Sequence, residues 1–309
     1  MSFENAKSII DYALVSQMDR VVFTGGEPSL YKELNSLISY AKAKSLKTTL
    51  VTNGVVYADR VKAELLKKSG IDFVSISIKG FNENEYLECT GTKGFENFLK
   101  AIENFSQLKI DFSLSFVLDD KNIENLPNIL KLLKERNCEN FFFNFVYNFK
   151  TDNSPDEYKE KYFPLKLIEK FEKVYPQICQ ITNDKFKIST SYPYCFWSKD
   201  IIDKMLEKNQ ISLCCPIYAD RKIVFDTDLS IIPCNAMGEI KYSRLEKDFK
   251  VEDIVSAVES ERSKKIKSKL KTLPSKRCLN CDKNKICFGG CITHYTHWTL
   301  DEILEMKKC

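Results

Sequence analysis

The amino-acid sequence predicts an α/β protein whose parallel sheet is either open or curled into a barrel, followed by a small cysteine-rich domain. Two observations carry this prediction. In residues 1–150, short β-rich runs alternate with helical patterns at a fairly regular spacing. Nine of the twelve cysteines lie between Cys195 and Cys309. Repeated βα units need right-handed crossovers, which place their strands parallel in one sheet.

Five runs are expected to be strands, because they are rich in apolar residues, as parallel strands buried on both faces are. They are Arg20–Thr24, Lys47–Thr52, Asp72–Ile78, Ile110–Leu118 and Asn140–Tyr147.

Three helices are expected from apolar stripes of period 3.6. The first covers residues 3–16, with Ser2 as its N-cap. The stripes consist of Ile9, Ile10, Ala13 and Leu14, of Leu34, Leu37, Ile38 and Ala41, and of Ile123, Leu126, Leu130 and Leu133.

Length and composition limit the class of protein. A chain of 309 residues suggests one large domain with a smaller one attached. The formal charge of +4 gives no electrostatic reason to expect a nucleic-acid partner. No apolar run is long enough for a membrane span, and the first residues lack signal-peptide features. We therefore expect a cytoplasmic protein, with domains at 1–150 and 206–309 joined by a helical segment at 151–205.

The first expected strand ends in a turn that suits a ligand. Gly25 and Gly26 allow a tight turn and a close approach to the backbone. Glu27 then offers a carboxylate to a cation, and Pro28 stiffens the exit. Chemistry in such sheets sits at the carboxyl ends of the strands, so this turn is either an ammonium site or an ordinary βα turn.

This segment resembles a known motif. Residues 21–30 resemble the GGEP region of radical SAM enzymes, and residues 50–54 and 74–80 resemble their third and fourth barrel strands, with Lys79 in place of the usual Asp. The resemblance implies a partial (βα)6 TIM-like barrel lacking its first strand. It also implies S-adenosylmethionine (SAM) at the strand ends, held by Gly25, Gly26, Glu27, Pro28, Ser77 and Ser115.

The family's C-x3-C-x2-C motif, which binds the radical-initiating cluster, belongs upstream of this turn. The 24 residues before Gly25 contain no cysteine. Either the sequence starts late or the protein lacks that cluster. We do not expect SAM cleavage by this polypeptide alone.

A second motif lies near the C-terminus, where Cys278, Cys281, Cys287 and Cys291 form a C-x2-C-x5-C-x3-C pattern. The C-x2-C spacing lets two thiolates reach one metal from a turn. Zinc and an iron–sulfur cluster use similar ligands, so the motif alone leaves both possible.

The wider cysteine layout resembles the SPASM domain, with Cys214-Cys215 upstream of a short hairpin that closes on Cys234. The resemblance implies two auxiliary [4Fe–4S] clusters. The second would take Cys278, Cys281, Cys287 and Cys309, and the first Cys214, Cys215, Cys234 and Cys291.

Two details depart from the family's pattern. Its ligands are usually spaced, whereas Cys214 and Cys215 are adjacent, so one of them is a bystander, Cys195 replaces one, or the cluster keeps an open site. The expected glycine of the hairpin falls at Leu229, and its turn is expected to rely on Asp228.

The resemblance implies a radical SAM/SPASM iron–sulfur enzyme that modifies a peptide or protein by radical hydrogen abstraction. Its reductant would be a flavodoxin or ferredoxin. Asn235 stands where sulfatase-maturing relatives have an Asp that acts as a base, so sulfatase maturation is not expected. Two alternatives remain. One is a non-catalytic peptide-binding or electron-transfer partner with a degenerate barrel, and the other is a zinc-binding RNA-interaction protein.

Overall fold

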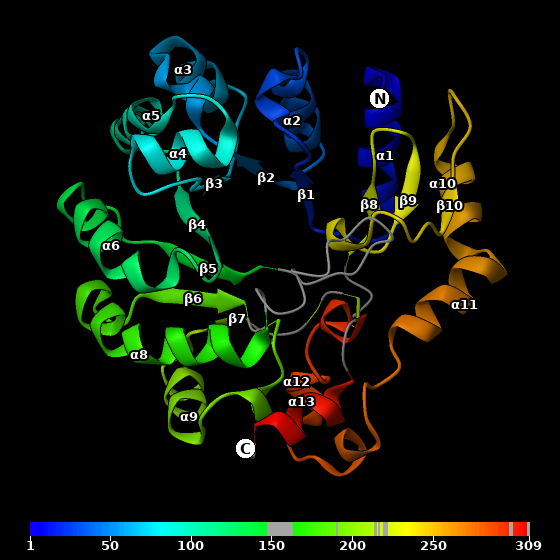
Figure 1. The fold of residues 1–309 in the computed structure, drawn as a ribbon. Helices are drawn as coiled ribbons and strands as arrows, with labels where there is room; N and C mark the ends of the chain where they lie inside the picture. Colours follow the sequence, from blue (N-terminus) through cyan, green and yellow to red (C-terminus); the bar gives the residue numbers. More distant parts are fainter. Residues whose placement is uncertain are drawn as a thin grey trace. The chain divides into compact units, whose positions relative to one another are not determined.

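The computed structural model describes residues 1–146, 163–189, 191–212, 215, 217–218, 222–296 and 299–307. Seven strands form one sheet in chain order: β1 Arg20–Phe23, β2 Lys47–Thr52, β3 Phe73–Ser77, β4 Phe112–Leu118, β5 Phe141–Phe145, β6 Phe186–Ser189 and β7 Ile211–Ser212 (Figure 1). The pairs β1–β2, β2–β3, β3–β4, β5–β6 and β6–β7 are parallel. The parallel α/β sheet with the strand order of a TIM-like barrel confirms the predicted fold class.

The five predicted strands are all present, and two further strands were not predicted. The strands β6 and β7 have four and two residues, too few to show a pattern in the sequence. A second, three-stranded sheet has the order β10-β9-β8, with β8 Val224–Phe225, β9 Ser230–Ile232 and β10 Ser243–Arg244.

Two compact units make up the chain. The first comprises Met1–Phe116, Phe225–Ile231 and Tyr242–Ser260, and the second comprises the rest. These units do not follow the predicted boundaries at residues 150 and 205, which stay a prediction.

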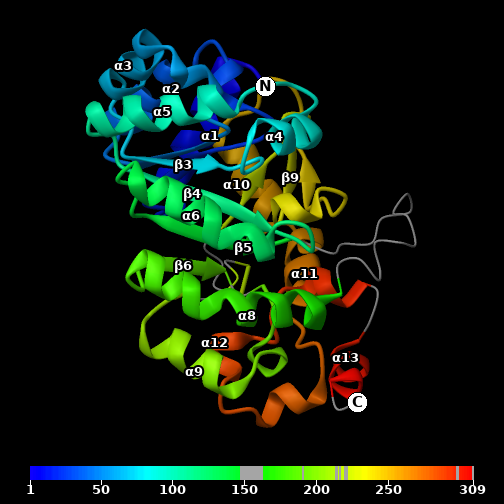
Figure 2. The same ribbon diagram turned by 60° about the vertical axis from the view of Figure 1, so that its left-hand side comes forward.

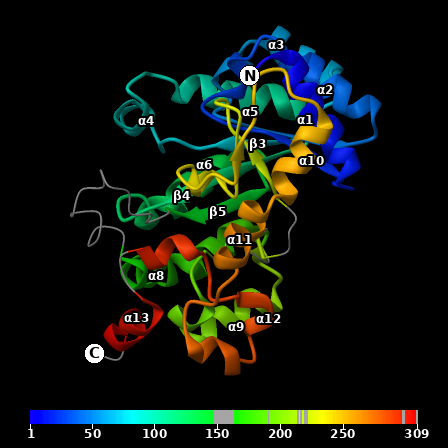
Figure 3. The same ribbon diagram turned by 90° about the vertical axis from the view of Figure 1, so that its right-hand side faces the viewer.

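The helices of the first unit are α1 Phe3–Val15, α2 Leu34–Ala43, α3 Arg60–Lys68, α4 Glu83–Thr90, α5 Phe95–Gln107 and α10 Val251–Glu259, with 3-10 turns η1 Pro28–Leu30 and η2 Val55–Ala58. Figures 1 and 2 show α2, α3 and α5 on one side of the strands β1–β3. Figure 3 shows α10 beside α1, with which it is in contact.

The first helix begins as the sequence predicts, since the Ser2 side chain accepts a hydrogen bond from the Asn5 N–H. Its buried face differs in part from the predicted one. Ala6, Ile10 and Ala13 pack into a core with residues of α2, whereas Leu14 is 39% exposed. The spacing i, i+4, i+7 of the buried residues is that of one helix face, and Leu14 lies off it. The other two predicted stripes are buried throughout.

The helices of the second unit are α6 Leu126–Glu135, α8 Pro164–Thr182, α9 Lys199–Glu207, α11 Glu261–Leu270, α12 Asn284–Cys287 and α13 Leu300–Met306. Its 3-10 turns are η3 Ile123–Asn125, η4 Tyr194–Phe196, η5 Asn235–Met237, η6 Lys276–Asn280 and η7 Ile292–Thr296. No helix of the described chain is both long and apolar enough to cross a membrane.

An aromatic core holds the second unit together and fixes the segment at residues 192–197. The Phe145 ring of β5 lies 4.9 Å from Tyr192 and 5.7 Å from Trp197, measured between ring centroids. Trp197 also meets Phe171 of α8 edge-on at 5.8 Å. Edge-to-face pairs add stability beyond the area they bury.

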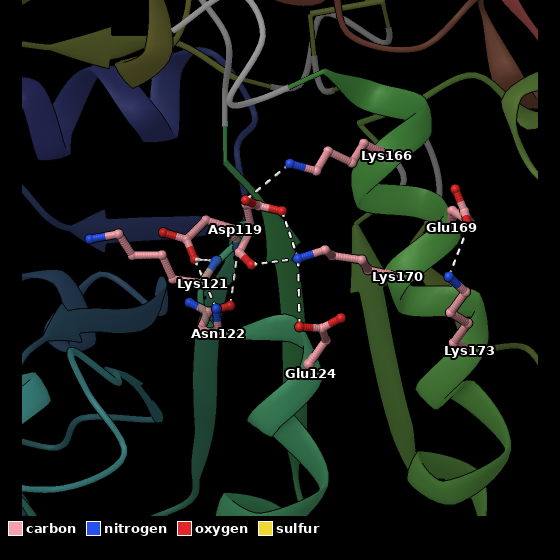
Figure 4. Close-up of polar contacts among 9 residues, drawn as sticks. Asp119, Lys121, Asn122, Glu124, Lys166, Glu169, Lys170 and Lys173 are labelled. Carbon is pink, nitrogen blue, oxygen red and sulfur yellow. Dashed lines mark hydrogen bonds and ion pairs between the residues drawn. The ribbon is translucent and has the colours of Figure 1, made fainter. Parts of the chain in front are cut away.

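A charged network joins α8 to the turn after β4 (Figure 4). The Lys170 Nζ lies 2.7 Å from the Asp120 Oδ1 and donates a hydrogen bond to the Asp120 carbonyl. Lys166 pairs with the same carboxylate at 3.2 Å, and Glu124 lies 3.6 Å from Lys170. The network therefore links the carboxyl end of β4 to the first half of α8.

Candidate cofactor and cluster sites

The turn after β1 leaves open space over its two glycines. Gly25 has φ +146°, in the region that only glycine adopts readily. A Cβ added at Gly25 or at Gly26 would meet no atom within 4 Å. The backbone of both residues is therefore free for close approach by a ligand.

The Glu27 carboxylate is already held by the protein. It accepts hydrogen bonds from the Ser29 N–H at 3.0 Å, from the Thr52 hydroxyl at 2.6 Å and from the Asn53 N–H at 2.8 Å. These bonds join the end of β1 to the end of β2 and start the η1 turn at Pro28. Three of the carboxylate's roughly four acceptor positions are thus in use. Its predicted role toward a cation stays a prediction, and its observed role is to fix the turn.

Two more of the predicted SAM-site residues lie on the neighbouring strands. Ser77 ends β3 and pairs in register with Ser115 of β4. Both are partly exposed. The glycine turn, Ser77 and Ser115 thus belong to the carboxyl-terminal parts of β1, β3 and β4, all in the first unit.

Four cysteines of the second unit line one cavity of about 430 Å³: Cys195, Cys278, Cys281 and Cys287. We call it the four-cysteine cavity. Its volume lies within the range of small-molecule sites, about 300–1,000 Å³. Lys199 and Lys283 also line it, and each forms an ion pair with an aspartate of the same lining, Asp203 and Asp282 respectively.

Two cysteines of this cavity, Cys278 and Cys287, are partly buried, whereas Cys195 and Cys281 are exposed. The Tyr194 N–H donates to the Cys287 Sγ at 3.4 Å. Burial raises the pKa of Cys287, although N–H groups of Tyr194, Gly289 and Gly290 oppose the rise by favouring its thiolate. Burial also raises the pKa of Cys278, and the charge of Cys287 adds to it. Without a metal, these two thiols hold their protons at neutral pH.

Gly290 lets two backbone segments beside the cavity approach each other closely. Gly290 has φ +78°, and an added Cβ would lie 2.7 Å from the Ser191 carbonyl oxygen and 2.8 Å from the ring of Pro193. The next residue, Cys291, donates its N–H to that same carbonyl. Only glycine lets the two segments approach this closely.

Three further cysteines form a second set, Cys215, Cys234 and Cys291, which we call the Cys291 group. Burial raises the pKa of Cys291 to about 11, and the charges of Cys215 and Cys234 add to the rise. The Cys291 Sγ is 3.1 Å from the Thr293 hydroxyl, and the Lys222 Nζ donates to the Cys234 Sγ at 4.0 Å. The charges of Cys215 and Cys234 thus act on the Cys291 thiol, and the assignment of these three residues to the first auxiliary cluster stays a prediction.

Two predicted ligands, Cys214 and Cys309, lie outside the described residues. Among those that are described, no three His, Cys, Asp or Glu side chains gather closely enough to hold one metal ion. A [4Fe–4S] cluster places its four irons apart, so its ligand thiolates are spread more widely than those of a single ion.

Comparison with known proteins assigns the first part of the chain to a family. Residues 1–133 match the model of the radical SAM superfamily. Residues 1–133 are a radical SAM domain. Its match includes the glycine turn and the strands β1–β4.

Relatives with assigned names share part of this chain. It is 32% identical over 149 residues to the Fe-coproporphyrin III synthase of Methanosarcina barkeri, covering 48% of this chain and 37% of that protein. It is 31% identical over 124 residues to the PqqA peptide cyclase of Granulibacter bethesdensis, covering 40% and 33%. The match thus spans 37% of the first relative and 33% of the second.

Solved structures share the fold over a longer stretch. The structure of anSMEcpe with bound AdoMet has a TM-score of 0.69 at 18% identity, covering 100% of this chain and 86% of that chain. SuiB of Streptococcus suis bound to S-adenosylmethionine has a TM-score of 0.67 at 19% identity, covering 98% and 70%. The likeness extends the fold beyond the radical SAM domain to the cysteine-rich part.

The place of Cys195 in the four-cysteine cavity is not predicted by the sequence. From the sequence, Cys195 is expected only as a replacement for Cys214 or Cys215 in the first auxiliary cluster. The cysteine stands alone in its segment, with no partner at ligand spacing, so only its place in the fold reveals its neighbours. The flanking Tyr194, Phe196 and Trp197 were the available signal, because three aromatic residues beside a cysteine predict a buried anchor.

Proposed function

We propose that this chain is a radical SAM enzyme, or part of one, that modifies a peptide or protein substrate by hydrogen abstraction. Its C-terminal region would be a SPASM domain with two auxiliary [4Fe–4S] clusters. The observation that carries the proposal is the four-cysteine cavity, because three of its thiols come from a motif at cluster-ligand spacing and the Cys287 sulfur receives a main-chain hydrogen bond. The radical SAM domain beside it in the sequence supplies the reaction class.

The residues of the turn after β1 fit SAM. The open space over Gly25 and Gly26 admits the methionine end of the ligand, and the backbone carbonyls there accept hydrogen bonds from its ammonium group. Glu27 would keep the turn rigid through its hydrogen bonds to Thr52 and Asn53, in addition to any contact with the ligand. Pro28, Ser77 and Ser115 complete the proposed set. When bound, SAM on a reduced [4Fe–4S] cluster supplies the radical chemistry of this superfamily.

The cysteines fit auxiliary clusters. Amide donors to sulfur stabilise the thiolate form and tune the potential of the iron that it binds. The Cys291 group, with Cys214, would hold the other cluster.

A peptide substrate is proposed because similar proteins are named for a peptide or were solved with a bound peptide. One relative is a PqqA peptide cyclase, and neighbours of the fold are described with the Cp18Cys peptide and with the precursor peptide SuiA. Asn235 follows Cys234, and an amide cannot accept a proton as a carboxylate does, so a different substrate from that of the sulfatase-maturing enzymes is expected. A flavodoxin or ferredoxin would supply electrons.

Metal analysis of anaerobically purified protein tests the cluster half of the proposal. We expect about eight irons and eight sulfides per chain, as two [4Fe–4S] clusters require. Colourless protein that holds zinc and no iron would instead favour the zinc-binding alternative.

Titration calorimetry with SAM tests the other half. We expect binding by the wild-type chain and at least a tenfold loss in Gly26→Val, whose side chain fills the space over the turn. Gly238→Val is the matched control, because an added Cβ there also meets no atom within 4 Å and lies far along the chain. Equal SAM affinity in all three proteins would remove the SAM site from the proposal.

One further observation distinguishes an enzyme from the alternative, a non-catalytic partner protein. An in-frame C-x3-C-x2-C motif in the coding sequence upstream of Met1 would supply the initiating cluster and support an enzyme. A stop codon before any such motif would favour the partner.

A further inference from the structure

The positive charge of the chain is concentrated in one stretch of the second unit. Ten of the 24 residues from 262 to 285 are Lys or Arg, and one is acidic. This stretch has a net charge of +9, which leaves −5 for the rest of a chain whose formal charge is +4. It runs from α11 through η6 to the start of α12. The small charge of the whole chain therefore hides a strongly basic region.

Part of this charge is not neutralised within the protein. Lys264, Arg277 and Lys283 each pair with an acidic side chain. Five exposed cations of the stretch have no ion-pair partner among the residues that the structure describes. They are Arg262, Lys265 and Lys269 of α11, Lys276 of η6 and Lys285 of α12. These five cations provide the charge that an acidic partner can meet.

Two apolar side chains lie at the surface of the same stretch. Leu279 is 66% exposed and follows Lys276 by three residues, and Ile286, next to Lys285, is 37% exposed. The elements that carry them, η6 and α12, are in contact. Exposed apolar side chains with charged neighbours are the composition of a protein interface, whose centre is apolar and whose rim is polar.

The residue types favour a protein partner over a nucleic acid. The stretch from 262 to 285 contains no Phe, Tyr or Trp. Single-stranded nucleic acids are bound by stacking their bases on aromatic side chains within a basic groove. Leucine and isoleucine pack instead against apolar protein surface, while lysines pair with carboxylates around it.

The neighbouring cysteines indicate the kind of protein. Leu279 lies between Cys278 and Cys281 in the sequence, and Ile286 precedes Cys287. These three cysteines line the four-cysteine cavity, and Cys281 is exposed. Electron transfer slows steeply with distance, so a carrier has to dock next to the group that it serves. Carriers of this kind dock through small, weak interfaces, which suit a patch of this size.

We propose that Lys276, Leu279, Lys285 and Ile286 form the docking surface of an acidic electron-carrier protein, a flavodoxin or ferredoxin, whose approach the free cations of α11 steer. This inference rests on the proposed function, because it needs a redox group in the four-cysteine cavity. In the docked complex the reduced carrier loses one electron and that group gains it, and no bond forms or breaks.

Carrier binding by charge-reversal variants tests the docking surface. A purified flavodoxin and a purified ferredoxin would be titrated into the anaerobically purified, iron-loaded chain at about 50 mM salt, where surface charges are weakly screened. We expect Lys276→Glu/Lys285→Glu to bind the carrier at least about tenfold more weakly than the wild type. Lys93→Glu/Lys100→Glu is the matched control, because it reverses two exposed lysines of the first unit and changes the net charge equally. The control should bind as the wild type does.

Two further variants separate the parts of the surface. Leu279→Ser should weaken carrier binding about tenfold without altering its salt dependence, because it removes apolar area only. Val61→Ser, at a valine of α3 that is 62% exposed, is its control. Lys265→Glu/Lys269→Glu on α11 lies outside the cysteine motif and should slow association without loss of iron. Matching iron content and melting temperatures would show that the variants keep their fold and their clusters.

The possible outcomes separate this inference from the proposed function. Iron-loaded protein that binds neither carrier, or binds it equally well in the wild type and in Lys276→Glu/Lys285→Glu, would overturn the inference and leave the proposed function standing. Tighter binding of a single-stranded RNA oligonucleotide or of poly-glutamate than of either carrier would overturn it in favour of that class of ligand. A wild-type chain without iron or sulfide would overturn both.

Discussion

At the scale of single residues, the hairpin between β8 and β9 contains a strained leucine. Leu229 has φ +68°, the conformation for which the family's pattern has a glycine. Asp228 supports the turn as the sequence predicts, because its carboxylate accepts hydrogen bonds from the Ser230 N–H and hydroxyl. The left-handed conformation costs a residue with a Cβ about 1–2 kcal/mol.

Leu229→Gly should therefore be more stable than Leu229→Ala by about 1 kcal/mol. Both variants remove the leucine side chain, but only glycine removes the strain. Urea denaturation of the two variants measures the difference. Equal midpoints would show that the turn is not strained by its side chain.

Glu27 offers a second test at this scale. Glu27→Gln replaces an acceptor of three hydrogen bonds by a group that also carries two N–H donors, so at least one bond is lost. We expect the free energy of unfolding to fall by about 1.5–3 kcal/mol, the value of a hydrogen bond to a charged group. SAM affinity should fall with it.

The control for this variant is Glu64→Gln, which alters an exposed carboxylate of α3 paired with Arg60. Calorimetry and thermal unfolding of both proteins give the comparison. A Glu27→Gln protein as stable as Glu64→Gln would contradict the anchoring role.

At the scale of elements, close contact between the loops of the second unit depends on Gly290. Gly290→Ala would place a methyl group 2.7 Å from the Ser191 carbonyl oxygen in a left-handed conformation. We expect a loss of at least about 2 kcal/mol of stability and a fall in bound iron. Gly238→Ala, in open space, should change neither property. Normal stability and iron in Gly290→Ala would refute the argument.

The charged network of α8 predicts a pH dependence. The hydrogen bond from Lys170 lowers the pKa of Asp120, and burial only partly opposes it. A carboxyl group whose pKa is lower in the folded state stabilises the protein above its unfolded pKa of about 3.9 and loses this effect as the pH falls through the folded value.

Asp120→Asn should accordingly be less stable than the wild type at pH 7, with a free energy of unfolding lower by about 1 kcal/mol or less. Its melting temperature should be lower as well. The gap should close as the pH falls below about 4. Glu169→Gln removes an exposed pair with Lys173 on the same helix (Figure 4) and should change little. A gap that does not depend on pH would exclude the ion pair as its source.

At the scale of the whole molecule, the proposed clusters join segments that are far apart in the chain. The Cys291 group alone draws on residues 215, 234 and 291. Because ligands of this kind converge only in the folded state, metal binding adds to folding stability. We expect iron-loaded protein to melt several degrees higher than the same protein after chelation, in anaerobic calorimetry. Equal melting temperatures would mean that the cysteines do not bind a structural group.

The sequence was sufficient for the strands of the radical SAM domain, because each is a continuous β-rich run, and for α1, α2 and α6, which carry apolar stripes. The helices α3, α4 and α5 were not among those predicted. The sequence failed for β6 and β7, which are too short for any period to be visible. The cysteine motif could be located because its ligands are close in sequence. Cys195 could not, because its neighbours are about 83 to 92 residues away, brought together by the aromatic core and Lys307.

The position of β1 also has a practical consequence. It has a single neighbour, β2, in the described sheet, and Val22 is 48% exposed. The outward main-chain groups of such an edge can template the addition of a strand from another molecule. Concentrated preparations of this polypeptide would then be prone to self-association through β1, and a lysine at position 22 would be the simplest way to keep them monodisperse.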